Sequence, residues 1–348
     1  MKKNLVLLLV LLVVGAVAWF FYNNSHAKSL ANEPLADFAI EDTASVNKII
    51  ITDQDGHSAK VERIPGKKLW RLNDQYLARE DAIDLLLNTF KRIRIRGNVS
   101  DNARENMMKL MVTNSKKVEI FTGGDEPAKI YYVGIPTPDH TGTHMLLEIP
   151  GVGRSSEPYI THMDGFSGFL TTRFFTDVNE WRFTGVFNYS ELQFKKVNIE
   201  NYLDPASSIA VEYLGGNDIK LYEGYDNGSQ TFGPLIPNFD TLAVKNLLLQ
   251  FKKMHVESYN TGLTQTQQDS IRQLSPSFRV TVIDNNNEVS TIDLFRRKSL
   301  QNYVDEQGNP ILWDDGHFWA IVNHGDLALA QTYTFNPVVQ PRRFYEKK

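Results

Sequence analysis

The chain has 348 residues, of which 42% are hydrophobic and 22% charged, a composition typical of a folded protein long enough for about two domains. Its 37 basic and 41 acidic residues give a net charge of -4 and are interspersed, which argues against nucleic acid as a partner. The chain has no cysteine, which excludes disulfide bonds, thiol catalysis, Fe–S clusters and lipidation of a lipobox cysteine.

Residues 5–22 form an apolar run without a charge, LVLLLVLLVVGAVAWFFY. As a helix, this run would reach about 27 Å, close to the roughly 30 Å hydrocarbon layer of a membrane. Lys2 and Lys3 precede it, so the positive-inside rule keeps residues 1–4 in the cytoplasm and sends the remaining chain across. We therefore expect a single-pass anchor in the bacterial inner membrane, with the bulk of the chain in the periplasm.

A cleaved signal peptide is the alternative for this segment, because Ser25-His26-Ala27 fits a small-x-small cleavage pattern. Cleavage would release a soluble periplasmic ligand-binding protein. The bulky aromatic residues at 19–22 suit a membrane interface better and favour the retained anchor. Residues 23–37 are mostly small and polar, which predicts a linker.

The region 38–180 predicts a first α+β domain. Strand patterns cover 46–51, 59–63 and 69–72, and later 118–121, 129–133 and 143–149. Between these two sets, apolar residues at helical period predict an amphipathic helix over 79–93, namely Ile83, Leu86, Leu87, Phe90 and Ile93. A weaker helix is expected over 102–111, and a short helix or turn over 166–175.

The region 181–348 repeats this order of elements. Strand patterns cover 194–199, 209–212 and 219–222, and later 280–283, 289–295 and 316–321. The helix between them repeats the apolar stripe position by position, as Val244, Leu247, Leu248, Phe251 and Met254. Insertions are expected at 223–238 and 299–310, and a solvated tail at 341–348. The chain thus predicts two tandem similar domains, each an antiparallel sheet with one long amphipathic helix, behind the transmembrane helix.

The order of a strand, a turn, a strand, a strand containing Trp70 and an acidic, Leu-rich helix start at 79–87, behind a membrane segment, resembles the bacterial DUF4340 family. That family is a domain of unknown function in envelope proteins, some of them encoded beside ABC-2 type transporters and gliding-motility-like auxiliary subunits. The resemblance covers most of the chain and rests on structural motifs. It implies an extracytoplasmic accessory role and no chemistry.

Two clusters contain residues suited to chemistry. His140 and His144, with Asp139, have the types and spacing of zinc ligands on a helix, but the surrounding Pro and Gly residues argue against a helix and predict polar loop residues. Asp314, Asp315 and His317 would suffice for general acid/base catalysis by a glycan-acting or other hydrolase. Asp-Asp-Gly is also an ordinary turn before a strand, and we expect no catalytic, cofactor-binding or metal site.

Aromatic residues are the better indication of a partner. In the pairs Tyr131-Tyr132 and Phe318-Trp319, strand alternation sends one ring to each face, and the outward rings together with Trp313 predict either a partner surface or a seam between the two domains. Asp42-Thr43-Ala44 and the similar triplets at 240–242 and 269–271 resemble O-glycosylation sites of some envelope bacteria. Asp240 is equally well placed as a helix N-cap.

These observations predict a membrane-anchored extracytoplasmic binding or scaffolding subunit with a protein partner in the envelope, auxiliary to an ABC-type transport or envelope complex. The hydrolase that uses Asp314, Asp315 and His317 and the cleaved periplasmic ligand-binding protein are the alternatives.

Overall fold

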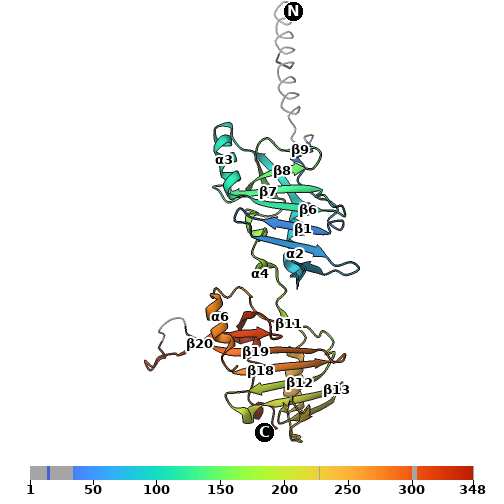
Figure 1. Ribbon diagram of the computed structural model, residues 1–348, viewed down its shortest axis with the longest axis vertical. Coiled ribbons are helices and arrows are strands. Elements are labelled where there is room, and N and C mark those ends of the chain that lie inside the picture. The colour runs from blue at the N-terminus through green and yellow to red at the C-terminus, as the bar shows by residue number, and fades with distance from the viewer. Residues whose placement is uncertain (1–13, 16–33, 227, 300–303, 348) are drawn as a thin grey trace, which may run out of the picture. The chain divides into compact units, whose positions relative to one another are not determined.

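The structure is a computed structural model that describes residues 14–15, 34–226, 228–299 and 304–347. The chain divides into two compact units, the first up to Trp181 and the second from Arg182. Each unit contains a large antiparallel sheet with helices packed on it, so the fold class is α+β (Figure 1). The helices within the described ranges include none long and apolar enough to cross a membrane. The expected anchor at 5–22 lies outside these ranges except for Val14 and Gly15.

The first unit is built on a 10-stranded sheet with the order β4-β3-β2-β1-β6-β7-β8-β10-β5, and β9 pairs with β8. Its strands are β1 (Lys48–Thr52), β2 (Ser58–Arg63), β3 (Trp70–Leu72), β4 (Tyr76–Leu77), β5 (Ile93–Asn98), β6 (Lys116–Phe121), β7 (Lys129–Pro136), β8 (Thr143–Ile149), β9 (Gly153–Arg154) and β10 (Tyr159–Met163). Its helices are α2 (Glu80–Arg92), α3 (Asp101–Asn114) and α4 (Val178–Trp181), with 3-10 turns at Pro34–Ala36 and Thr171–Arg173.

Helix α2 forms where the apolar stripe predicts it. Ile83, Leu86 and Phe90 are buried in the core of the first unit. Acidic residues open the helix and basic residues close it, as its dipole favours. The chain then enters β5 directly at Ile93 instead of turning away, and this strand was not predicted.

The second unit is built on a 7-stranded sheet with the order β14-β13-β12-β18-β19-β20-β21. Its strands are β11 (Gly185–Phe187), β12 (Phe194–Asn201), β13 (Ile209–Gly215), β14 (Asp218–Tyr222), β15 (Tyr225–Asp226), β16 (Thr231–Phe232), β17 (Met254–His255), β18 (Phe278–Asp284), β19 (Val289–Lys298), β20 (Trp313–Val322) and β21 (Leu327–Gln331). Its helices are α5 (Thr241–Gln250), α6 (Gln265–Arg272) and α7 (Thr332–Phe335), with 3-10 turns at Pro205–Ser207 and Arg342–Phe344.

The sheet of the second unit buries apolar side chains on both of its faces. Val280 and Leu294 belong to the main core, together with Leu247 of α5. Phe295, the next residue of β19, points to the opposite face and packs with Ile271 of α6 in a smaller cluster. Helix α6 therefore covers a second apolar surface of the sheet, which the sequence patterns did not predict.

Helix α5 begins as predicted, because the Asp240 side chain accepts hydrogen bonds from the amides of Leu242 and Ala243. The helix ends at Gln250, so the apolar stripe is longer than the helix. Phe251 lies at the helix cap and Met254 in β17, and both are still buried in the core.

Two expectations for the second unit are wrong. The C-terminal segment is not a solvated tail: Tyr345 is fully buried, and its carbonyl accepts a 2.7 Å hydrogen bond from the Asp240 amide. The sequence Asp314-Asp315-Gly316 is not a turn before a strand but lies inside β20, which starts at Trp313. In addition, the expected insertion at 223–238 contains the β15–β16 hairpin.

Candidate functional site

An apolar cavity of about 590 Å³ lies in the second unit, at the end of the sheet where β19 and β20 extend beyond β18. Its volume is within the range of small-ligand and side-chain pockets. Six large apolar residues form most of the wall, namely Leu203, Ile271, Leu274, Phe295, Trp313 and Trp319. Polar residues line the remainder, namely Ser275, Ser277, Arg296, Arg297, Lys298 and Ser299.

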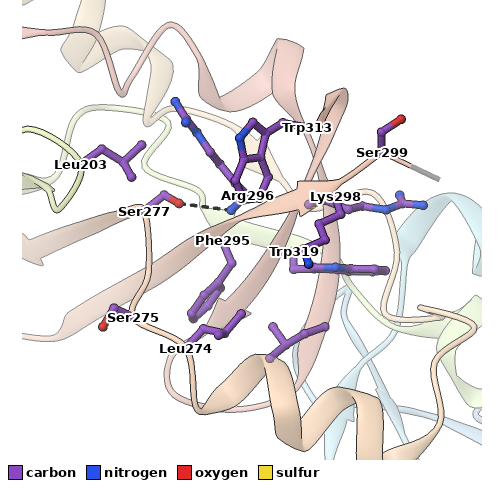
Figure 2. Close-up of a pocket in the computed structure, with 12 residues that line it drawn as sticks. Leu203, Leu274, Ser275, Ser277, Phe295, Arg296, Lys298, Ser299, Trp313 and Trp319 are labelled. Carbon is purple, nitrogen blue, oxygen red and sulfur yellow. Dashed lines mark hydrogen bonds between the residues drawn. The ribbon is translucent and has the colours of Figure 1, made fainter. Parts of the chain in front are cut away.

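Three elements position these walls. Phe295 comes from β19, Trp313 and Trp319 come from β20, and Ile271 comes from α6. Figure 2 shows Phe295 and Leu274 lying together beside the helix, with Ser277 and Arg296 linked by a hydrogen bond above them. In that bond the Arg296 amide donates to Ser277 Oγ at 3.2 Å, which holds the loop before β18 against β19.

Three consecutive cations border the cavity. Arg297 Nη1 lies 3.4 Å from Asp314 Oδ2, and its guanidinium lies 4.8 Å from the centre of the Trp319 ring. Arg296 lies 5.9 Å from the Trp313 ring. In the part of the chain that the structure describes, no carboxylate forms an ion pair with Arg296 or Lys298. The charge of Arg297 is thus balanced locally, whereas Arg296 and Lys298 are exposed to solvent at the border of the cavity.

The structure brings together two of the three residues predicted for a hydrolase, Asp314 and His317, and adds Glu257 to them. His317 Nδ1 lies 3.4 Å from Asp314 Oδ2, and His317 Nε2 lies 3.2 Å from Glu257 Oε2. Asp315 is exposed and takes no part in this cluster. Glu257 follows β17, far from the others in sequence, and no local pattern could have indicated it.

This arrangement is better suited to holding the strand than to proton transfer. Both ring nitrogens of His317 face carboxylates, that of Asp314 on one side and that of Glu257 on the other. Neither nitrogen is then open to a substrate, as a general base requires. The groups form a chain of polar contacts, Arg297–Asp314–His317–Glu257, that fixes the start of β20 beside the cavity.

The second predicted cluster is not assembled. His144 lies in β8, where a strand was predicted over 143–149, and it is buried instead of being a polar loop residue. Its Nδ1 lies 3.0 Å from the carbonyl oxygen of Ile135. His140 lies in the preceding turn. Hydrogen bonds from Thr137 and Thr141 hold the pKa of Asp139 well below its usual range, which fits a residue that stabilises this turn.

A different group in the first unit has ligand atoms close enough for a metal ion. Asp53, Asp55 and His57 lie in the turn between β1 and β2, with these atoms within 4.8 Å of one another. Burial acts to raise the pKa of Asp53, but hydrogen bonds from Thr176 and His57 outweigh it and lower the pKa. Those bonds account for the arrangement as an ordinary hydrogen-bonded turn.

The aromatic pairs divide as strand alternation predicts. Tyr131 is fully buried, whereas the Tyr132 hydroxyl donates to Glu148 Oε2 at 2.9 Å on the other face. Phe318 belongs to the main core, and Trp319 lies in the cavity wall. Trp313 is 44% exposed. The sequence thus predicted that Trp313 and one ring of the Phe318-Trp319 pair lie outside the main core, without saying which ring, whereas Leu274, Arg296 and Lys298 gave no recognisable signal.

The three triplets that resemble glycosylation sites also have local roles. Asp240 is the N-cap of α5, Asp42 Oδ1 accepts a 3.1 Å hydrogen bond from the Ala44 amide, and Asp269 lies within α6. Modification of these sites stays a prediction.

Comparison of the chain with models of known protein families finds no match, and comparison with curated proteins finds none.

Proposed function

We propose that the chain is a membrane-tethered, extracytoplasmic binding subunit that holds a partner protein at the cavity of its second unit. The observation that carries this proposal is an open apolar hollow with two tryptophans in its wall and unpaired cations at its border. Tryptophan and arginine are the residues most enriched in the energetic centres of protein interfaces. Large exposed apolar patches on folded proteins commonly serve such contacts.

The proposed architecture is a tandem pair of related domains. Strand orders support it: the first sheet contains the path β3-β2-β1-β6-β7-β8-β10, and the second follows β14-β13-β12-β18-β19-β20-β21. In chain order both paths read third, second, first, fourth, fifth, sixth and seventh strand. In both units the long helices lie between the third and the fourth of these strands. Duplication of one ancestral domain would produce this pattern.

The proposed location is the bacterial inner membrane, with the folded units in the periplasm. The apolar run at 5–22 and the two lysines before it support this. Fractionation of cells that produce the full chain tests it: the protein should stay with membranes after a carbonate wash. N-terminal sequencing separates the anchor from a cleaved signal peptide, since cleavage would leave a soluble chain that starts after Ala27.

The proposed role is that of an accessory subunit in an ABC-type transport or envelope complex. The resemblance to the DUF4340 family supports it, as does the absence of an open catalytic constellation around His317 in the described residues. Affinity purification from membranes in several mild detergents is the test. A defined set of envelope proteins should be recovered with the chain, and recovery of the lone monomer in every detergent would contradict the role.

Two matched variants test whether recovery of the partner depends on the cavity. Leu274 lines the cavity and is exposed, so Leu274→Asp places a charge in the cavity with little cost to folding. Leu249 is an exposed leucine at the end of α5, outside the cavity, and Leu249→Asp is its control. Partner recovery should fall roughly tenfold or more with Leu274→Asp, which corresponds to the loss of one well-buried apolar contact. Recovery with Leu249→Asp should equal that of the unaltered chain.

The hydrolase that uses Asp314, Asp315 and His317 remains the alternative function. Its support is the cluster of carboxylates around His317, with distances of 3.2 and 3.4 Å. Replacing all three residues by alanine separates the two functions. A hydrolase would lose its cellular phenotype entirely with partner recovery unchanged, whereas a binding subunit should lose function only as far as recovery falls.

A further inference from the structure

Strand β19 has a free edge at its C-terminal end, apart from the Arg296 amide, which donates to Ser277 Oγ. On one side, β18 begins at Phe278 opposite Leu294, so no strand of the described chain pairs with residues 295–298 there. On the other side, β20 continues the ladder as far as Lys298, which lies opposite Trp313. A free strand edge presents backbone N–H and C=O groups with which another extended segment can pair.

The two faces at this edge differ in character. Phe295 lies on the face covered by α6, where Trp319, Ile271 and Leu274 form the apolar part of the cavity (Figure 2). Arg296 is the next residue of the strand and therefore points to the opposite face. A strand added here would meet an apolar hollow on one face and a cation on the other.

The charge at this edge is uncompensated. Arg297 pairs with Asp314, but Arg296 and Lys298 have no carboxylate partner within the ranges the structure describes. Both side chains are exposed, so their charges remain available to a ligand. Opposite charges at an interface guide encounter and fix register, which favours an acidic partner.

We propose that the free edge of β19 binds an extended segment of a partner protein, in which acidic and large apolar residues alternate, by adding it to the sheet as a further strand. This inference rests on the proposed function and names the chemistry of the partner. The apolar side chains of the segment enter the cavity beside Phe295 and Trp319. Its carboxylates lie beside Arg296 and Lys298. Its backbone hydrogen bonds to this edge set its register, and there one of its carbonyl oxygens replaces Ser277 Oγ as the acceptor for the Arg296 amide.

Fluorescence anisotropy with labelled peptides tests this proposal on the full chain in nanodiscs of neutral lipid. The probe is a heptapeptide that alternates aspartate with leucine. Replacing its aspartates by lysines should weaken binding roughly tenfold or more, because like charges then meet Arg296 and Lys298. N-methylation of alternate amides on one edge of the peptide should also weaken binding about tenfold, because it removes backbone donors.

Variants of the chain test whether Arg296 and Lys298 cause the preference for the aspartate peptide. Changing Arg296→Gln and Lys298→Gln together should weaken binding of the aspartate peptide severalfold and remove its preference over the lysine peptide. The matched control changes the exposed pair that follows α5, Lys252→Gln and Lys253→Gln, and should leave both affinities unchanged. Equal loss in the two double variants would mean a general charge effect and would overturn the assignment.

The remaining outcomes separate this inference from the proposed function. Two peptides are compared here, one N-methylated along one edge and the other along the opposite edge. Equal binding of the two would overturn strand addition. A dodecanoate adduct in native mass spectra without peptide binding would assign the cavity to a small amphiphile and also overturn it. If Leu274→Asp lowers partner recovery while no peptide binds, only the inference fails. If Leu274→Asp has no effect on recovery either, both fail.

Discussion

Tyr345 has a fully buried side chain whose hydroxyl forms no hydrogen bond among the described residues. Burial raises the pKa of this hydroxyl above its usual value, since the charged form would lose its hydration. The ring packs in the main core of the second unit and fixes the C-terminal segment against the start of α5. The ring therefore stabilises the fold, and the hydroxyl opposes it.

Variants of Tyr345 separate these two contributions. Tyr345→Phe removes an unsatisfied polar group and should leave the free energy of unfolding unchanged or raise it. Tyr345→Ala should lower it by about 3–5 kcal/mol, the cost of emptying an aromatic site in a core. Phe344→Ala is the control, because Phe344 is exposed. Urea denaturation measures all three, and equal effects at positions 344 and 345 would contradict this account.

Glu200 on β12 is a carboxyl group whose partial burial makes its contribution to stability depend on pH. Burial raises the pKa of its carboxyl group in the folded state above the unfolded value, although a hydrogen bond from Tyr202 and the charge of Arg279 act against this. The unfolded chain therefore releases this proton at lower pH than the folded chain does. The contribution of Glu200 to stability is greatest in acid and is lost as the pH rises through the folded pKa.

Glu200→Gln should accordingly stabilise the protein at pH 7. The gain relative to the unaltered chain should shrink as the pH falls through the carboxyl pKa, because both side chains are then neutral. Urea denaturation from pH 4 to pH 7 measures it. A gain that grows in acid would show that the folded state prefers the charged carboxylate.

At the scale of elements, the local sequence predicts the structure of some segments and not of others. The stripe of α2 and the cap of α5 depend on neighbouring residues, and both were predictable. The strand β5 immediately follows α2 and depends on pairing with β10, which is distant in sequence. Such pairing is set by the whole sheet, so a local pattern cannot reveal it.

The candidate site likewise combines residues that the local sequence indicates with contacts that it does not indicate. Strand alternation predicted that one ring of the Phe318-Trp319 pair points away from the main core, and the structure shows that this ring is Trp319. The cavity itself requires α6 to cover the second face of the sheet. The capping box of Thr264 and Gln267 indicates the start of this helix locally, but not the face of the sheet that it covers. The link between Glu257 and His317 likewise depends on tertiary packing. Long-range contacts therefore decide how these residues come together in the site.

Packing of α3 on β7 provides a test at this scale. A Cβ atom at Gly134 of β7 would lie 2.3 Å from Met111 Sδ and 3.0 Å from the His144 carbonyl oxygen. Gly134→Ala should therefore destabilise the first unit by about 1–3 kcal/mol through overpacking. Gly97→Ala in β5 is the control, because nothing lies within 4 Å of its Cβ position. Thermal unfolding distinguishes the two, and equal effects would contradict the close approach of α3.

At the scale of the whole molecule, each unit has its own core. The cluster around Leu86 and Trp181 belongs to the first unit, and the cluster around Leu247 and Leu294 to the second. Units with separate cores can fold separately. Residues 34–181 and 182–348, produced as separate fragments, should therefore each unfold in one cooperative transition. Calorimetry measures this, and a fragment without a transition would mean that one unit requires the other.

The central claim is that a partner binds at the cavity of the second unit, and site-specific photo-crosslinking in cells tests it most directly. A photoreactive amino acid is placed at position 274 or 313 in the cavity wall, and at exposed positions 249 and 333 as controls. The account predicts a discrete crosslinked product of one partner from positions 274 and 313 that the controls lack. No product from the cavity positions, or the same products from all four, would contradict it.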